Sequence, residues 1–180
     1  CIVQWVRDAG QCVRAVVGMA RLRPSPAGGC QGIFANVAVI HAYYQARGEG
    51  EQHSESITTI LSHPGNAGTA AALGYKVITL YPDESGIPDL EALKAAVSEH
   101  TAALLITNPE DTGIYNEKIR QFVDIVHAAG GLCVYDQANL NGLMGITRAR
   151  DAGFDLCPLN LHKPFPSPHG RPGPGPGPPG

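Results

Sequence analysis

The fold of this chain is decided by the stretch from residue 130 to residue 170. It contains two short apolar runs, Leu132-Cys133-Val134-Tyr135, which ends at Asp136, and Leu156–Leu161, which ends at His162-Lys163. Both runs have the length and composition of buried β-strands. Residues 139–153 between them form a plausible crossover connection. The sequence therefore predicts that Asp136 and Lys163 reach the same edge of a sheet.

In open α/β sheets, ligands bind in the crevice outside the carboxyl ends of the strands. An acid and a lysine that converge there have a use in enzymes that depend on pyridoxal 5'-phosphate (PLP). The lysine amine forms a Schiff base with the cofactor aldehyde, and the carboxylate keeps the pyridine nitrogen protonated. The residues alone leave two ordinary alternatives open, since a lysine is most often a solvated surface group and an acid after a strand is often a helix cap.

The rest of the chain alternates between segments typical of strands and of helices. The expected strands are β-branched or apolar and lie at 57–61, 75–80 and 102–106. The expected helices begin after turns or carry apolar residues at helical spacing, and lie at 33–47, 64–72, 90–99 and 119–129. Residues 1–18 are compatible with a further helix. This alternation predicts a mostly parallel sheet with helices on both faces.

Composition narrows the classes of function. A chain of 180 residues with 43% apolar and 16% charged residues fits about one globular domain. A net charge of −3 provides no basic surface for nucleic acid or an anionic membrane, and no apolar run approaches the ~18 residues of a membrane span. The five cysteines are scattered without a C-x-x-C pair, which argues against disulfides or a zinc site and indicates a reducing cytoplasm. The histidines show no metal-ligand spacing, so no metal is expected.

Two longer motifs resemble a known family. They are Tyr135-Asp136-Gln137-Ala138-Asn139-Leu140-Asn141-Gly142-Leu143 and Asn160-Leu161-His162-Lys163-x-Phe165-x-Ser167-Pro168-His169-Gly170. Both resemble the glycine decarboxylase family, the P-protein of the glycine cleavage system, and more narrowly the second subunit of its two-subunit bacterial and archaeal form. The resemblance runs from about residue 22 to residue 170.

The resemblance implies the α/β fold of PLP-dependent transferases of fold type I, the aspartate-aminotransferase-like class. Residues 1–24 are then expected to be a partial N-terminal helical segment, and residues 25–170 an incomplete PLP-binding large domain. Every residue after Arg171 is proline or glycine, so residues 171–180 are expected to form a disordered tail. We accordingly expect a truncated fragment of a longer protein.

The resemblance also implies roles for particular residues. Lys163 would be the Schiff-base lysine, Asp136 the partner of the pyridine nitrogen, and His63 the side chain stacked over the ring, and these three would be the catalytic residues. The further cofactor-binding candidates include a phosphate-binding turn formed by Gly28, Gly29, Cys30 and Gln31. Ala138 would pack on the opposite face of the ring, and Thr107 and His162 would be neighbours of the site.

The implied activity is that of a glycine dehydrogenase (aminomethyl-transferring). It decarboxylates glycine with PLP, transfers the aminomethyl group to the lipoyl group of H-protein, and works with subunit 1 in a heterotetramer. This sequence departs from the family's pattern at Pro164, which replaces the threonine after the lysine, at Pro166, and at His63-Pro64-Gly65-Asn66. Two alternatives therefore stay open: a catalytically inactive truncated fragment, and another fold-type-I PLP decarboxylase such as the glutamate type, which shares the His-Lys pair.

Overall fold

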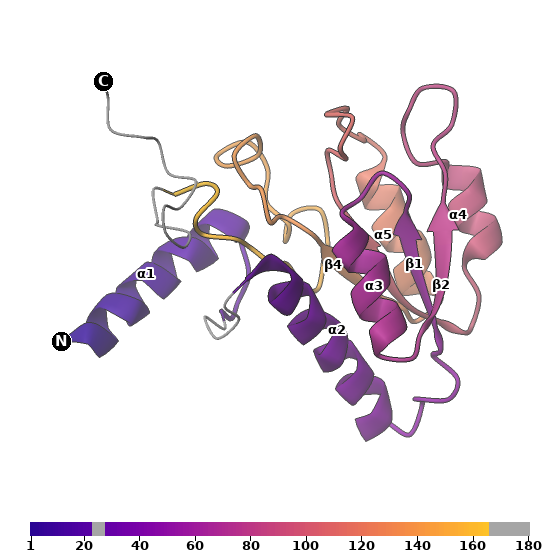
Figure 1. The fold of residues 1–180 in the computed structure, drawn as a ribbon, viewed down its shortest axis with the longest axis horizontal. Coiled ribbons are helices and arrows are strands. Elements are labelled where there is room, and N and C mark those ends of the chain that lie inside the picture. The colour runs from indigo at the N-terminus through magenta and orange to yellow at the C-terminus, as the bar shows by residue number, and fades with distance from the viewer. Residues whose placement is uncertain (23–27, 166–180) are drawn as a thin grey trace.

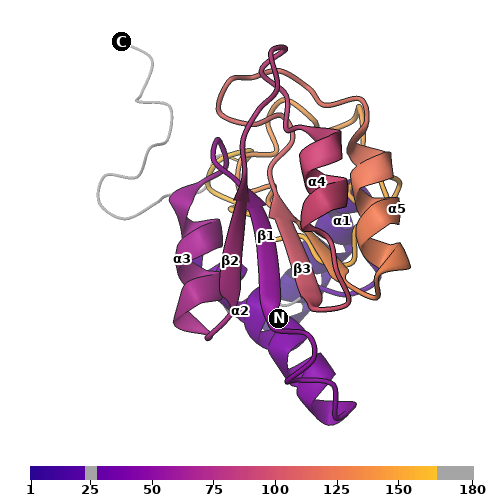
Figure 2. The ribbon, with the colours of Figure 1, turned by 90° about the vertical axis from the view of Figure 1, so that its right-hand side faces the viewer.

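A computed structural model describes residues 1–22 and 28–165 of the chain. Within these residues four strands form one parallel sheet in the order β2-β1-β3-β4 (Figures 1 and 2). The strands are β1 (Glu55–Thr59), β2 (Lys76–Leu80), β3 (Thr101–Ile106) and β4 (Leu132–Tyr135). The helices are α1 (Ile2–Val17), α2 (Gly29–Ala46), α3 (Pro64–Ala72), α4 (Leu90–Ala96) and α5 (Ile119–Ala128).

The sheet is covered by helices on both faces, as the sequence predicts. Successive side chains of a strand point to opposite faces, and β3 shows this clearly. Leu105 packs in one apolar cluster with residues of α2 and α3, while Leu104 and Ile106 pack in the other with residues of α4 and α5. Both faces of β3 are therefore buried, which is characteristic of a central parallel strand.

The order of the strands creates a switch point next to β1. The chain passes from β1 through α3 to β2 on one side, and then returns to β3 and β4 on the other side. In sheets of this kind the carboxyl ends of the strands at the switch point border a crevice that binds ligands. The topology thus selects the loops after β1, β3 and β4 as the place for a site.

The helices form where apolar residues repeat at helical spacing. The buried face of α2 consists of Ile33, Val37, Ile40 and Tyr44, and that of α5 consists of Ile119, Phe122, Val123 and Val126. Three of the expected elements differ by more than one residue at an end: α2 begins at Gly29, β1 spans 55–59, and α4 ends at Ala96.

The second apolar run of the deciding stretch does not form the expected strand. Leu156 lies parallel to β4 and accepts a hydrogen bond from the backbone N–H of Tyr135 (N···O 2.9 Å), but it makes only an isolated bridge with Val134. Pro158 follows two residues later and has no N–H to continue a ladder. The chain then enters a turn at residues 161–165. The expectation of a strand there was wrong, although the segment does run beside β4.

The first helix contacts the domain through its carboxyl end. Val13 and Val17 are buried, whereas Ile2 and Trp5 near the other end are about 80% exposed (82% and 78%). In Figure 1 the amino end of α1 points away from the sheet. No helix among the described residues combines the length and the apolar character that a membrane span requires. The proposed tail at 171–180 lies outside the described residues.

Candidate active site

A pocket of about 440 Å³ lies at the carboxyl ends of the strands. Its walls come from the loops that follow β1, β3 and β4, together with Lys163. The predicted residues that line it are His63, Thr107, Asp136, Ala138 and Lys163. Five residues chosen from separate parts of the sequence therefore meet in one cavity.

Asp136 provides the buried charge of the pocket. It follows the last residue of β4, and its backbone N–H bonds to the carbonyl of Ile106 (2.9 Å), which extends the ladder with β3 by one step. The side chain is only 3% exposed. Its two oxygens accept one bond each, from the Asn66 amide (3.3 Å) and from the backbone N–H of Ala138 (3.1 Å). Both donors are neutral, and no ion pair involves Asp136 among the described residues.

His63 sits at the entry to α3. Its Nδ1 atom accepts a hydrogen bond from the backbone N–H of Gly65 (2.9 Å), so the imidazole caps the helix. A neutral ring in this position carries its proton on Nε2. Pro64 occupies the first position of the helix, where the missing N–H leaves no acceptor unpaired. The departure from the family's pattern at residues 63–66 is therefore compatible with an ordered histidine.

The loop after β3 is held by a polar network. Asn108 is buried and pairs with the backbone of Asn116 through both ends of its amide (2.8 and 3.1 Å). The backbone carbonyl of Asn108 accepts a hydrogen bond from the Tyr135 hydroxyl (2.6 Å). Next to it, the Thr107 hydroxyl is buried and has no hydrogen-bond partner among the described residues. The network fixes the loop and leaves the Thr107 hydroxyl of the pocket wall without a partner in the described part of the chain.

Lys163 is exposed and projects from a turn. The backbone N–H of Lys163 bonds to the Asn160 carbonyl (3.0 Å), and that of Phe165 bonds to the Leu161 carbonyl (3.0 Å). Neither bond uses the N–H of residue 164. Because the turn closes without that donor, Pro164 fits beside the lysine with no loss of backbone bonding.

The remaining predicted residues lie next to the pocket and do not line it. Gly28 is the N-cap of α2, and Gly29, Cys30 and Gln31 form its first turn, where backbone N–H groups lack acceptors within the helix. A Cβ at Gly29 would lie 2.6 Å from the Asn160 amide nitrogen, so this turn packs directly against the segment that leads to Lys163. His162, in that segment, is also absent from the lining.

Asn66 and Glu110 are among the residues of the site that were not singled out from the sequence. Asn66 is fully buried in the first turn of α3 and donates to Asp136. Glu110 lines the pocket, is 6% exposed and accepts a hydrogen bond from the Thr59 hydroxyl. Burial raises the pKa of the Glu110 carboxyl, and the Thr59 hydroxyl opposes this effect. A polar residue in an otherwise small-residue helix was the available signal for Asn66, whereas Glu110 resembles an ordinary turn residue.

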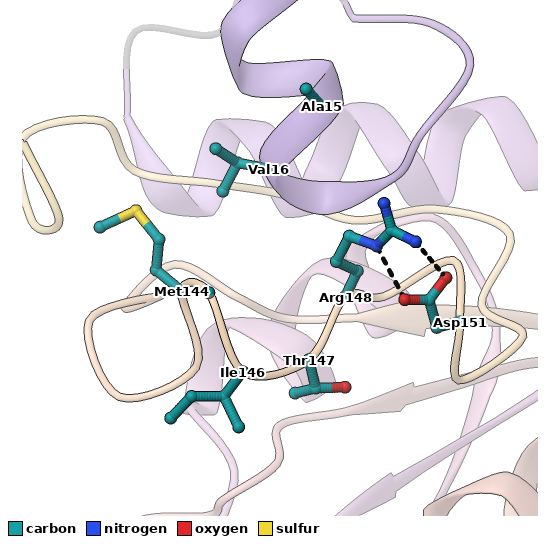
Figure 3. Close-up of a pocket in the computed structure, with 8 residues that line it drawn as sticks. Ala15, Val16, Met144, Ile146, Thr147, Arg148 and Asp151 are labelled. Atoms are coloured by element: carbon teal, nitrogen blue, oxygen red, sulfur yellow. Dashed lines mark hydrogen bonds and ion pairs between the residues drawn. The ribbon is translucent and has the colours of Figure 1, made fainter.

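A second cavity, of about 310 Å³, lies between α1 and residues 144–151 (Figure 3). Arg148 is held there by Asp151 through two hydrogen bonds of 2.7 and 3.0 Å. Val16 and Met144 provide apolar walls. None of the predicted site residues lines this cavity, and its arginine is already paired.

Solved structures share the fold. A NifS-like protein matches 87% of this chain and 43% of its own, with a TM-score of 0.67 and 20% identity. The SepCysS–SepCysE N-terminal domain complex matches 88% of this chain and 42% of its own, with a TM-score of 0.68 and 18% identity. At such identities the likeness establishes the fold alone. This α/β fold with a parallel sheet is the fold-type-I fold that the family resemblance implies.

The sequence relatives share one name. A probable glycine dehydrogenase (decarboxylating) subunit 2 from Pyrococcus abyssi is 48% identical over 99% of this chain, and one from Thermococcus kodakarensis is 47% identical over the same share. One from Nitrosomonas eutropha is 43% identical over 94% of the chain. No protein-family model matches the chain. Over the region that it spans, the chain is similar to proteins named glycine dehydrogenase (decarboxylating) subunit 2. It spans about a third (35%) of the length of these relatives.

Proposed function

We propose that this chain carries the PLP site of a glycine dehydrogenase (decarboxylating), with Lys163, Asp136 and His63 as its catalytic residues. The observation that carries the proposal is the pocket at the switch point. It joins a buried acid, an exposed lysine and a helix-capping histidine. The names of the relatives supply the reaction.

The residues of the pocket fit this cofactor. Asp136 is a buried acid that accepts bonds only from neutral donors of the described chain, and a buried carboxylate is stable when a cation lies against it. A protonated pyridine nitrogen is such a cation. Thr107 lines the pocket and offers the cofactor or the substrate a buried hydroxyl that has no partner within residues 1–22 and 28–165. When bound, PLP supplies an electron sink for the charge that the departing carboxyl group leaves behind.

The chain's own residues then have separate tasks. Lys163, which is exposed in a turn, would hold the cofactor through its side-chain amine. Asp136 would favour the protonated form of the pyridine nitrogen through its negative charge. His63 and Ala138 would contact opposite faces of the ring.

The glycine-rich start of α2 is the proposed phosphate site. Gly28, Gly29, Cys30 and Gln31 form the beginning of a helix, whose dipole and backbone N–H groups favour an anion. The tight contact between Gly29 and Asn160 supports this assignment, because it brings the turn close to the segment of His162 and Lys163. His162 would contact the phosphate or its surroundings.

The partners are proposals of the same kind. We propose glycine as substrate, the lipoyl group of H-protein as acceptor of the aminomethyl group, and subunit 1 as a partner chain in a heterotetramer. The word subunit in the names of the relatives supports the last of these. All five cysteines are free thiols, which supports a reducing cytoplasm as the location.

The activity is tested by release of labelled carbon dioxide from carboxyl-labelled glycine, with PLP and lipoylated H-protein, in the presence and absence of subunit 1. Asp136→Asn keeps the shape of the side chain but removes the charge that faces the cofactor. We expect it to lower the rate by about 100-fold or more, as loss of an electrostatic stabiliser does.

Two results contradict the proposed reaction. Release from labelled glutamate in place of glycine would identify another decarboxylase on the same site. Binding of PLP without turnover of glycine, even with H-protein and subunit 1 present, would indicate the inactive alternative.

A further inference from the structure

Three side chains with metal-binding chemistry meet at the start of β4, away from the proposed active site. They are His127 in the last turn of α5, Cys133 in β4 and Asp155 in the segment beside β4. One donor atom of each lies within 4.8 Å of the others. None of the three lines the pocket that contains Asp136. We call these residues the His127 cluster.

The cluster is held in place by the backbone around it. The N–H groups of Asp155 and Leu156 both bond to the Cys133 carbonyl (3.0 and 3.2 Å). In return, the Cys133 N–H donates to Asp155 Oδ2 (2.8 Å). The turn between α5 and β4 is closed by a bond from the Gly131 N–H to the Val126 carbonyl (3.0 Å). A ligand would therefore bind to donors whose main chains are already ordered.

The three side chains of the His127 cluster favour one class of metal ion. A thiolate, an imidazole and a carboxylate together suit a divalent cation of borderline softness, and Zn²⁺ is the common one. Bond lengths of about 2.3 Å to sulfur and about 2.0 Å to nitrogen or oxygen separate the donors of a tetrahedral ion by roughly 3.3 to 3.5 Å. His127 Nε2 and Asp155 Oδ2 are 2.8 Å apart. No pair of donor atoms in the cluster is more than 4.8 Å apart, so the three lie close to this geometry.

Access and protonation are also compatible with an ion. The side chains of His127 and Asp155 are 35% and 33% exposed, while Cys133 is fully buried. An ion can reach His127 and Asp155 from solvent, and the Cys133 sulfur lies within 4.8 Å of their donor atoms. The bond between His127 and Asp155 that the ion replaces is a weak one, because it faces solvent. The thiol proton of Cys133 passes to solvent when the sulfur binds the metal.

We propose that His127, Cys133 and Asp155 bind one divalent cation, with Zn²⁺ the best fit and a water molecule as fourth ligand. The ion connects the end of α5 to β4 and to the segment after it. It acts on the stability of the domain and has no part in the proposed decarboxylation. Its test therefore needs neither PLP nor glycine.

The experiment uses the 180-residue chain, freed of metal by a chelator and titrated with Co²⁺ and then with Zn²⁺. A cobalt–thiolate bond gives a strong charge-transfer band in the near ultraviolet, which Zn²⁺ removes when it displaces Co²⁺. We expect one ion per chain, a band that depends on Cys133, and a higher midpoint of thermal unfolding with Zn²⁺, since a ligand of the folded state stabilises it.

Variants identify the ligands. Cys133→Ala is expected to abolish the band, and His127→Gln and Asp155→Asn to weaken Co²⁺ binding by about tenfold or more. Asp155→Asn retains an oxygen that can accept the bond from Cys133. Cys12→Ser and His100→Gln are matched controls, because both residues are exposed and lie outside the cluster.

The outcomes are decisive even if Cys133→Ala does not fold, because the other two variants change side chains that reach solvent. A wild-type chain without a charge-transfer band overturns the proposal. So does binding that is equally tight in the wild type and in His127→Gln and Asp155→Asn, which would indicate adventitious surface binding.

Discussion

Asp136 and Asn66 illustrate how single residues prepare the site. A buried carboxylate is costly unless it is bonded or paired. Asn66 and the backbone of Ala138 satisfy one bond to each oxygen of Asp136 and add no positive charge. The acid is thereby fixed in orientation while its charge stays available to a cationic ligand atom.

The Tyr44 hydroxyl connects α2 to the beginning of β3 and to the turn before β4. It donates toward the carbonyls of Ala102 (3.1 Å) and Gly130 (2.8 Å), and its ring stacks on His53 with centroids 4.0 Å apart. We expect Tyr44→Phe to lower the free energy of unfolding by about 1–2 kcal/mol, because buried carbonyls lose their donor.

Urea denaturation measures this change. Tyr43→Phe is the matched control, since its ring is 44% exposed on the same helix, and we expect almost no change there. Equal effects of the two substitutions would show that the Tyr44 hydroxyl does not stabilise the fold.

Glu110 gives a prediction about pH. Burial raises the pKa of its carboxyl, with a further contribution from the charge of Asp111, and the Thr59 hydroxyl opposes both. The folded state therefore holds this proton more tightly than the unfolded state does. Its stabilising effect is complete below the unfolded pKa and is lost as pH rises through the folded pKa. We expect Glu110→Gln to gain stability relative to the wild type as pH rises from about 4 to 7.

A carboxyl with the opposite shift provides the control. A hydrogen bond from Lys76 lowers the pKa of Glu55, so Glu55 contributes stability above its unfolded pKa and loses it as pH falls. Glu55→Gln should thus become less stable than the wild type over the same rise in pH. Denaturation midpoints at several pH values test both signs. A constant difference between Glu110→Gln and the wild type would contradict the buried, protonated carboxyl.

At the scale of elements, two glycines have opposite surroundings. Gly68 lies inside α3 and a Cβ there would meet nothing within 4 Å. Gly131 lies between α5 and β4, where a Cβ would come within 2.8 Å of Val126 and 3.2 Å of the Thr101 carbonyl. We expect Gly68→Ala to stabilise the protein by about 0.4–1 kcal/mol, since alanine favours the helix. Gly131→Ala should destabilise it by about 1–3 kcal/mol through overpacking.

Thermal unfolding of both alanine variants shows whether the local packing around each glycine determines the effect of the substitution. If the two midpoints move in the same direction, the packing described at one of these glycines is wrong.

The elements also show what periodicity can and cannot predict. The apolar stripes of α2 and α5 were readable because burial repeats at the helical period. The start of α2 could not be predicted, because Gly29 and Cys30 carry no periodic signal and the N-cap residue Gly28 has no capping side chain. Leu156–Leu161 has strand composition, yet Pro158 prevents a ladder. The His127 cluster was invisible to spacing because its three members come from three separate segments.

At the scale of the whole molecule, the topology of the parallel sheet brings most of the pocket residues together. Parallel strands place their carboxyl ends at one edge, so His63, Thr107 and Asp136 come together although 73 residues separate the first from the last by number. This convergence could be predicted from strand ends alone. The supporting contacts of Asn66 and Asn160 could not, because they depend on how α3 and the turn before Lys163 pack.

The central claim is that Lys163 holds PLP in this pocket. The most direct measurement is the absorption spectrum of the purified chain with added PLP, before and after borohydride reduction, followed by mass spectrometry of the labelled peptide. Lys94→Ala is the matched control for Lys163→Ala, since Lys94 pairs with Glu91 on the surface of α4. We predict a visible band in the wild type and in Lys94→Ala, its absence in Lys163→Ala, and cofactor fixed on Lys163 after reduction. A folded wild-type chain without the band, or a band that persists unchanged in Lys163→Ala, would contradict the account.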